Sequence, residues 1–189
     1  MKIVLIIGIV VLICGLYGIL LCMIQTDAKI EARNHINKRI IELFKAGRAN
    51  EVYNFYDSFV SNKEASIYMV NTALIFDIPV HYFIGLAYQE SSFRVKVKSK
   101  IKPDGSFDIG LFQLNTKVYK DYDVVYLLEI RNNTRLAGAH LTENYITAGN
   151  WYSALGLYNA GHEKHINFNH VKNILLYADM LDSKFSNRF

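Results

Sequence analysis

The chain begins with an apolar run that is long enough to cross a membrane. Residues 3–24 contain no charged side chain, and a helix of about 20 apolar residues spans the hydrocarbon core of a bilayer. A secretory signal has a shorter apolar stretch and a small-x-small cleavage site, and neither is present here. We therefore expect residues 1–26 to form a retained transmembrane anchor, with a cleaved signal as the alternative.

The charges around this run predict its orientation. Lys2 precedes it, whereas the charged residues that follow it, between Asp27 and Arg33, balance each other. Because positive charge near a span favours the cytoplasmic side, we expect a single-pass protein of the cytoplasmic (inner) membrane. The body of the chain would then lie on the extracytoplasmic, or periplasmic, side.

Apolar residues in the body recur mainly at helical spacing. Residues 28–44 predict a largely solvated helix that leaves the membrane and ends near Gly47. Ser61 and Glu64 have the spacing of a capping box, which predicts a helix from Ser61 to about Phe76. A further helix is predicted for residues 133–148, with Gly149 as its cap, and Gly161 is expected to end the helix that begins near Trp151. Three other stripes at helical spacing comprise Val80, Phe83, Ile84 and Ala87; Trp151, Ala154, Leu155 and Tyr158; and Val171, Ile174, Leu175 and Ala178.

One segment has a different period. From Arg94 to Lys102 basic residues alternate with apolar or small ones, and the turn-forming residues Pro103, Asp104 and Gly105 follow. The sequence therefore predicts a mainly α body with a small irregular or β insert. The alternation could bind an anionic polymer, or it could be the exposed face of a strand or loop.

Composition excludes several classes of protein. Of the 189 residues 51% are hydrophobic and 20% charged, with only 2 Pro, so the chain is expected to fold rather than to be disordered. The net charge of +4 is too small to indicate a nucleic-acid partner. Both cysteines, Cys14 and Cys22, lie in the apolar run, so the thiol-free body would tolerate an oxidising compartment.

Glu90 is the candidate for acid–base chemistry. It extends the stripe of Phe83 and Ala87 at the end of an apolar helix. A carboxyl group there is partly desolvated and faces the negative end of the helix dipole, and both effects raise its pKa. Such a group suits a general acid at neutral pH. The alternative is an exposed glutamate just past a helix end.

Three short segments occur in order around this residue. They are Tyr88–Phe93 (YQESSF), Asp108–Asn115 (DIGLFQLN) and Ala154–Gly161 (ALGLYNAG). Together they resemble the signatures of the lytic transglycosylase family with the SLT (soluble lytic transglycosylase, lysozyme-like) domain, over about residues 69–181. The resemblance implies a lysozyme-like α+β domain at residues 67–189, preceded by a helical stalk or N-terminal helices at residues 27–66. A finer similarity, to small transglycosylases of secretion systems, implies a cell-envelope assembly as partner.

The family resemblance also implies roles for individual residues. Glu90 would be the single catalytic acid and base, and Ser91 would hydrogen-bond it or the substrate. His170 takes the place of a family tyrosine and is counted with the substrate-binding group. That group comprises Ser91, Gly110, Gln113, Tyr158, Asn159 and His170.

The implied reaction cleaves peptidoglycan without water. The β-1,4 bond between N-acetylmuramic acid and N-acetylglucosamine would break as a 1,6-anhydromuramoyl product forms, with no cofactor. One alternative is a hydrolytic muramidase that uses Asp108 or Asp104 to activate water. Another is a non-catalytic wall-binding assembly protein with the same fold.

The histidines invite a metal interpretation that their spacing does not favour. His162, Glu163, His165 and His170 lack the helical His-Glu-x-x-His arrangement of a zinc site, so no metal is expected. His81 and His140 lie within predicted helices, where a structural role is the commoner one.

Overall fold

The structure, a computed structural model, describes residues 35–161 and 166–189. The predicted anchor at residues 1–26 lies outside the described residues, as do His162, Glu163 and His165. Within the described ranges, no helix combines the length and apolarity that crossing a bilayer requires.

The described chain is mainly helical with one very small sheet, which confirms the predicted class. Residues 35–45 are helical. The remaining elements, in chain order, are α2 (Ala49–Val60), α3 (Lys63–Ile75), α4 (Val80–Ser91), β1 (Asp108–Ile109), β2 (Leu114–Asn115), α5 (Val124–Leu128), α6 (Ile130–Ala148), α7 (Trp151–Ala160) and α8 (Phe168–Arg188).

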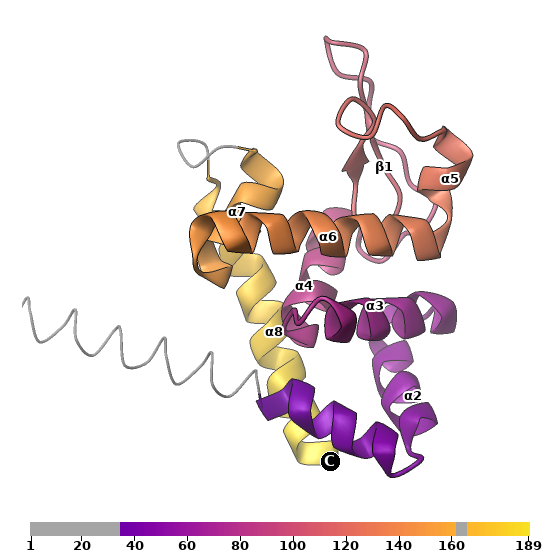
Figure 1. Cartoon of the computed structure of the whole chain (residues 1–189), viewed down its shortest axis with the longest axis vertical. Coiled ribbons are helices and arrows are strands. Elements are labelled where there is room, and N and C mark those ends of the chain that lie inside the picture. Colours follow the sequence, from indigo (N-terminus) through magenta and orange to yellow (C-terminus); the bar gives the residue numbers. More distant parts are fainter. Residues whose placement is uncertain (1–34, 162–165) are drawn as a thin grey trace, which may run out of the picture.

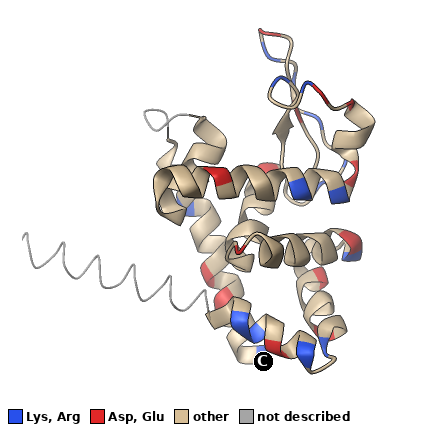
Figure 2. Ribbon diagram, viewed as in Figure 1, with Lys and Arg blue, Asp and Glu red and all other residues tan. Residues whose placement is uncertain are grey.

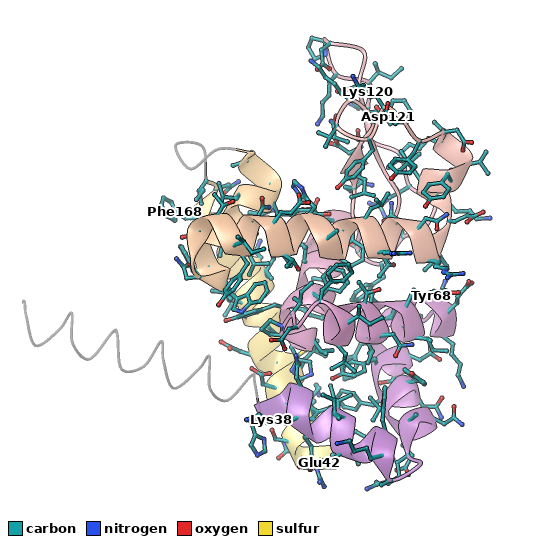
Figure 3. The ribbon with its side chains drawn as sticks, viewed as in Figure 1. Lys38, Glu42, Tyr68, Lys120, Asp121 and Phe168 are labelled. Atoms are coloured by element: carbon teal, nitrogen blue, oxygen red, sulfur yellow. The ribbon has the colours of Figure 1, made fainter. Side chains whose placement is uncertain are left out.

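Helix α4 is the central element of this arrangement. It packs along α8 and α3, while α6 packs against both α3 and α7 (Figure 1). The irregular insert between α4 and α5 projects at one end of the molecule, where Lys120 and Asp121 lie, and the helix that carries Lys38 and Glu42 lies at the other (Figure 3). The functional residues predicted from sequence therefore come from the end that carries the insert.

Burial explains why α4 is so apolar. Every residue from Val80 to Ala87 is buried, so the helix is enclosed on all sides rather than along one stripe. Gly85 makes this enclosure possible, because a Cβ atom there would lie 2.8 Å from the backbone oxygen of Ile174 in α8. Helix α8 thus packs against the backbone of α4, which fixes the position of the helix end that carries Glu90.

The helix boundaries confirm most predictions and correct one. Gly149 and Gly161 end α6 and α7 in the left-handed conformation, as expected. The predicted capping box at Ser61 is wrong: Asn62 caps α3, and its side chain accepts a hydrogen bond from the Ala65 N–H at 3.0 Å. Ser61 instead ends α2 with φ 54°, so it belongs to the end of α2 and not to the start of α3.

The helix over residues 35–45 is not the solvated stalk that its charges predicted. Ile36, Ile40 and Leu43 are buried in the same apolar cluster as α2, α4 and α8. The buried Asn37 side chain donates to the Ile78 oxygen at 2.9 Å and accepts from the Val80 N–H at 3.0 Å. These contacts fix the helix to the start of α4, so it shares one core with the rest of the described chain.

The insert is irregular with a minimal antiparallel ladder, as predicted. Strands β1 and β2 pair over two residues each, and Lys98 forms an isolated bridge with Ile109. Both basic and acidic residues occur over this part of the chain (Figure 2). Asp104 is a turn residue as expected, because its carboxylate accepts hydrogen bonds from the Ser106 N–H and hydroxyl and from Lys117.

Candidate active site

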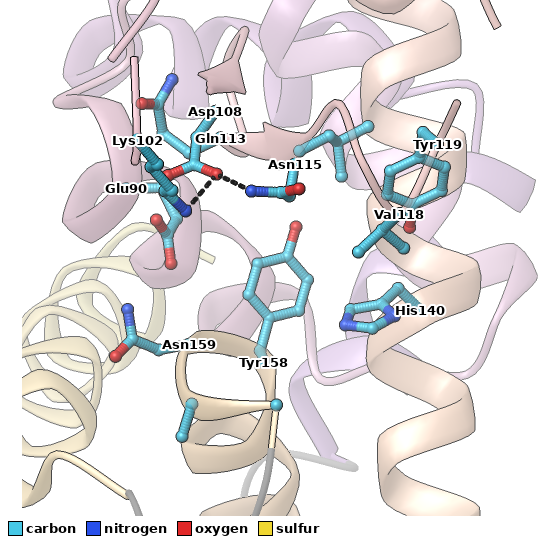
Figure 4. Close-up of a pocket in the computed structure, with 13 residues that line it drawn as sticks. Glu90, Lys102, Asp108, Gln113, Asn115, Val118, Tyr119, His140, Tyr158 and Asn159 are labelled. Carbon is cyan, nitrogen blue, oxygen red and sulfur yellow. Dashed lines mark hydrogen bonds and ion pairs between the residues drawn. The ribbon is translucent and has the colours of Figure 1, made fainter. Parts of the chain in front are cut away.

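A cleft of about 320 Å³ lies between the insert, α6, α7 and the end of α4 (Figure 4). It contains four of the seven residues predicted for the site, namely Glu90, Gln113, Tyr158 and Asn159. The other lining residues are Lys102, Asp108, Leu114, Asn115, Val118, Tyr119, His140, Ala160 and Gly161.

Glu90 occupies the last turn of α4 and is almost fully enclosed. Its side chain is 12% exposed, and its Oε1 atom is buried without a hydrogen bond among the described residues. Burial, and secondarily the charge of Asp108, raises the pKa of Glu90 to about 8, against a smaller opposing effect of Lys102. The carboxyl group is therefore mostly protonated at neutral pH, which is the state that a general acid requires.

The backbone turns sharply just after this residue. Ser92 ends α4 in the left-handed conformation, with φ 51°, and its N–H donates to the Tyr88 oxygen at 2.8 Å. Phe93 continues with φ 63°. These two residues turn the chain away from the helix axis and into the insert, so Glu90 lies where helix and insert meet at the wall of the cleft.

Asp108 is the other carboxylate in the cleft, and it is held by two donors. Its Oδ1 accepts from Lys102 Nζ and from Asn115 Nδ2, each at 2.8 Å (Figure 4). Asp104, the alternative second carboxylate, does not line the cleft. Hydrogen bonds from Ser106 and Lys117 hold its pKa far below the ordinary value.

Gln113 reaches the cleft from a strained loop. Its φ is 48°, and its side-chain amide donates to the Gly110 oxygen at 2.8 Å. Asn133, on α6, holds the same loop from behind: its Oδ1 accepts from Phe112 N–H at 2.8 Å, and its Nδ2 donates to the Ile109 oxygen at 3.0 Å. The loop conformation is therefore fixed by hydrogen bonds before any ligand binds.

Packing against Asn133 requires a glycine at position 110. It has φ +80°, and a Cβ atom there would lie only 2.3 Å from Asn133 Nδ2. The missing side chain leaves room for this buried amide, and Gly110 is not among the residues that line the cleft. Asn133 was predicted only as a helix start, since nothing local in the sequence links it to residues 109–112.

Tyr158 projects from α7 into the middle of the cleft, between Glu90 and His140 (Figure 4). Its hydroxyl donates to the Phe112 oxygen at 3.0 Å, and its ring packs edge-on against the His140 ring at a centroid distance of 5.1 Å. Burial, and then the nearby Glu90 carboxyl, raises the Tyr158 pKa well above its ordinary value. The phenol therefore stays neutral and links α7 to the Gln113 loop.

Two other predicted residues lie behind the cleft wall. Ser91 is 1% exposed, and its hydroxyl donates to the Ala87 oxygen within α4 at 3.2 Å, so it bonds neither Glu90 nor the cleft. His170 is also buried and does not line the cleft; its Nε2 lies 3.4 Å from Glu90 Oε1. The structure thus places His170 against the predicted acid rather than among substrate contacts.

Sequence reasoning missed several residues that line the cleft. His140 was assigned a structural role, but it faces the cleft opposite Glu90, and burial lowers its pKa. Tyr119, whose pKa burial raises to about 12, lies next to it. Lys102 did have a signal in the sequence, as the last member of the basic alternation. Within the described residues no group of three or more His, Cys, Asp or Glu could hold a metal ion.

Comparison with known proteins identifies the family. A search of curated proteins finds no match to the chain. A family model described as "Transglycosylase SLT domain" matches residues 67–175, more than half of the chain, and the match includes α4, the insert, α6, α7 and the start of α8. This match supports a peptidoglycan-acting function of the lytic transglycosylase type. The chain belongs to the transglycosylase SLT domain family.

Proposed function

We propose that this protein is a peptidoglycan lytic transglycosylase in which Glu90 is both the general acid and the general base. The observation that carries the proposal is a single protonated carboxyl group, buried at the cleft wall with its pKa raised to about 8. The cleft around it offers amide and phenol groups from Gln113, Tyr158 and Asn159, which suit a polar sugar chain.

The reaction needs only one acid–base group, because the proton that Glu90 gives to the leaving oxygen is replaced by the proton of the C6 hydroxyl. Glu90 protonates the glycosidic oxygen that leaves C1 of N-acetylmuramic acid, and the N-acetyl group of the substrate stabilises the positive C1. The resulting carboxylate then takes the proton of the C6 hydroxyl, whose oxygen bonds to C1. The products are a 1,6-anhydromuramoyl end and a free N-acetylglucosamine hydroxyl. Because the nucleophile belongs to the same sugar, its effective concentration is very high.

Asp108 favours this reaction over hydrolysis. Hydrolytic glycosidases generally use a second carboxylate to activate water or to form a covalent intermediate. Asp108 is the only other carboxylate among the described residues that line the cleft, and Lys102 and Asn115 both donate to its Oδ1. This oxygen already accepts two hydrogen bonds and is therefore less available to activate a water molecule, which supports the single-acid mechanism.

The proposed setting is the cell wall side of the cytoplasmic membrane. The apolar run at residues 3–24, with Lys2 before it, supports a single-pass anchor and an exported body. The absence of cysteine from residues 27–189 suits an oxidising compartment. Peptidoglycan glycan strands would be the substrate, and a cell-envelope assembly such as a secretion system the partner.

Product analysis tests the proposal. The full chain, purified in mild detergent, is incubated with purified cell walls, and the released sugar ends are identified by mass spectrometry. We expect 1,6-anhydro ends from the wild type and a loss of about 10³-fold or more in rate for Glu90→Gln, which cannot donate this proton. Wall binding should survive in that variant.

Two outcomes would support the other functions. Reducing sugar ends would indicate a muramidase, and an Asp108→Asn variant would then lose activity as well. Wall binding without any digestion by the wild type would indicate a non-catalytic assembly protein.

A further inference from the structure

His170 has no role in the mechanism given above. The residue is third in α8, and the Asn167 side chain that caps this helix accepts from the His170 N–H at 3.3 Å. The imidazole is 7% exposed, and its Nε2 lies 3.4 Å from Glu90 Oε1. Both atoms are buried, and neither has a hydrogen-bond partner among the described residues. Two unsatisfied polar atoms therefore face each other behind the cleft.

The distance between them is slightly longer than an ordinary hydrogen bond, which spans about 2.7–3.2 Å. Catalytic hydrogen bonds are often long in the absence of substrate and shorten when it binds. A movement of a few tenths of an ångström, with the ring N–H turned toward Oε1, would give the pair ordinary hydrogen-bond geometry.

The two oxygens of Glu90 are not equivalent. Oε1 is fully buried and faces His170, so Oε2 is the oxygen left to face the cleft that Glu90 lines. A proton on Oε1 would point away from any sugar. A productive acid must carry its proton on Oε2, and a donor at Oε1 enforces this arrangement, since Oε1 then acts as an acceptor.

The imidazole is suited to donate as a neutral group. Burial lowers the pKa of His170, and the positive end of the α8 dipole also disfavours an imidazolium so close to the helix start. Other charged or titratable groups reach Glu90 from the insert, through Asp108 and Lys102, and from α7, through Tyr158. None of these is a hydrogen-bond partner of Oε1.

We propose that His170 is a positioning residue for Glu90, whose neutral Nε2–H donates to Oε1 and so directs the acidic proton of Oε2 into the cleft. This inference rests on the function proposed for Glu90. The same hydrogen bond stabilises the carboxylate after Glu90 has protonated the leaving oxygen, until the carboxylate takes the proton of the C6 hydroxyl.

The test compares His170→Phe with His170→Gln in the full chain. Phenylalanine fills the site without a donor, whereas glutamine restores a neutral N–H donor. We expect kcat for wall digestion to fall about 100-fold in His170→Phe, with KM changed less than about threefold, because a misdirected proton affects only the chemical step. In His170→Gln, kcat should be at least about tenfold higher than in His170→Phe. His35→Gln, which alters an exposed imidazole on the helix over residues 35–45, is the control.

Two spectroscopic measurements do not depend on turnover. Carbon-13 NMR of the Glu90 carboxyl, assigned with Glu90→Gln, should show a higher pKa in His170→Phe than in wild type, since the lost donor favoured the carboxylate. Nitrogen-15 NMR of His170 at neutral pH should show a hydrogen on Nε2. A lower Glu90 pKa in His170→Phe, or an unprotonated Nε2, would overturn the proposal.

These readouts separate the two proposals. If the wild type digests no wall but both NMR results hold, the proposed function fails and the hydrogen bond stands. If the wild type produces anhydro ends while His170→Phe changes neither kcat nor the Glu90 pKa, the positioning role fails and the function stands.

Discussion

Helix α4 carries a buried titratable side chain near each end, and α8 faces both of them. At the first end, His81 is bonded through both ring nitrogens: Nε2 lies 2.8 Å from the Tyr56 hydroxyl and Nδ1 2.5 Å from an Asp182 oxygen. At the other end, Glu90 and His170 face each other at 3.4 Å without a hydrogen bond.

The difference indicates that one end of α4 contributes to stability and the other end to chemistry. The His81 network connects α2, α4 and α8, so its hydrogen bonds contribute to holding three helices together. The Glu90 end retains unsatisfied buried atoms, which cost stability, and such exceptions are concentrated at functional sites. This interpretation predicts that similar substitutions at the two ends differ in their effect on stability.

The largest expected effect is on stability, from paired substitutions of the two histidines. His81→Phe removes hydrogen-bond partners of the buried Tyr56 hydroxyl and of Asp182, and should lower the free energy of unfolding by about 3 kcal/mol. His170→Phe replaces an unsatisfied imidazole by an apolar ring of similar shape, and should change it by less than about 1 kcal/mol. Urea unfolding followed by circular dichroism measures both. Equal losses would show that the two ends do not differ.

A second pair tests how the cleft end is held without altering Glu90. Gly110 and Gly105 both have φ +80°, but a Cβ atom would lie 2.3 Å from Asn133 at the first and would meet nothing within 4 Å at the second. Gly110→Ala should therefore cost about 2 kcal/mol more than Gly105→Ala, which carries only the conformational penalty of about 1 kcal/mol. Thermal and urea unfolding of the two variants give the comparison. A Gly110→Ala variant as stable as Gly105→Ala would mean that Asn133 does not fix this loop.

The smallest effect concerns pH. The pKa of Glu90 is raised to about 8 in the folded chain from its ordinary value of 4.5. Between these values the unfolded chain releases this proton and the folded chain keeps it, so the contribution of Glu90 to stability is lost as pH rises. In Glu90→Gln this loss is absent. Between pH 6 and pH 7, the free energy of unfolding of the variant should therefore rise by about 1 kcal/mol relative to that of wild type. This is near the limit of about 1.4 kcal/mol per pH unit for one proton.

Urea unfolding of both proteins at pH 5, 6, 7 and 8 measures this gain, and Gln89→Glu, one residue away and partly exposed, provides a control. A constant difference between wild type and Glu90→Gln over this range would contradict the raised pKa.

The sequence predicted the features that depend on local periodicity. The stripe from Phe83 to Glu90 correctly implied a carboxyl group held near the core, and Gly149 and Gly161 marked two helix ends. The helix over residues 35–45 was misjudged because its charges suggested solvent, whereas Asn37 bonds the backbone at residues 78 and 80. Such a contact between segments about 40 residues apart leaves no local signal.

The same limit applies to the candidate site. Motif similarity assigned six residues to substrate binding. The structure places Gln113, Tyr158 and Asn159 in the cleft. It places Ser91, Gly110 and His170 behind the cleft wall. Asn133 and His140 come from α6, and their orientation depends on how that helix packs against the insert and α7. Packing between helices, rather than helix formation, decides which of these side chains meet the cleft.

The spacing of two residues on α8 limits where insertions and deletions can occur in this chain. His170 and Asp182 are separated by 12 residues, or about 18 Å along the helix axis, and each must meet a different end of α4. One added residue between them would rotate one partner by about 100° relative to the other. The spacing within α8 should therefore resist insertions and deletions more strongly than the exposed turn around Gly105, where a changed length would leave both partners in place.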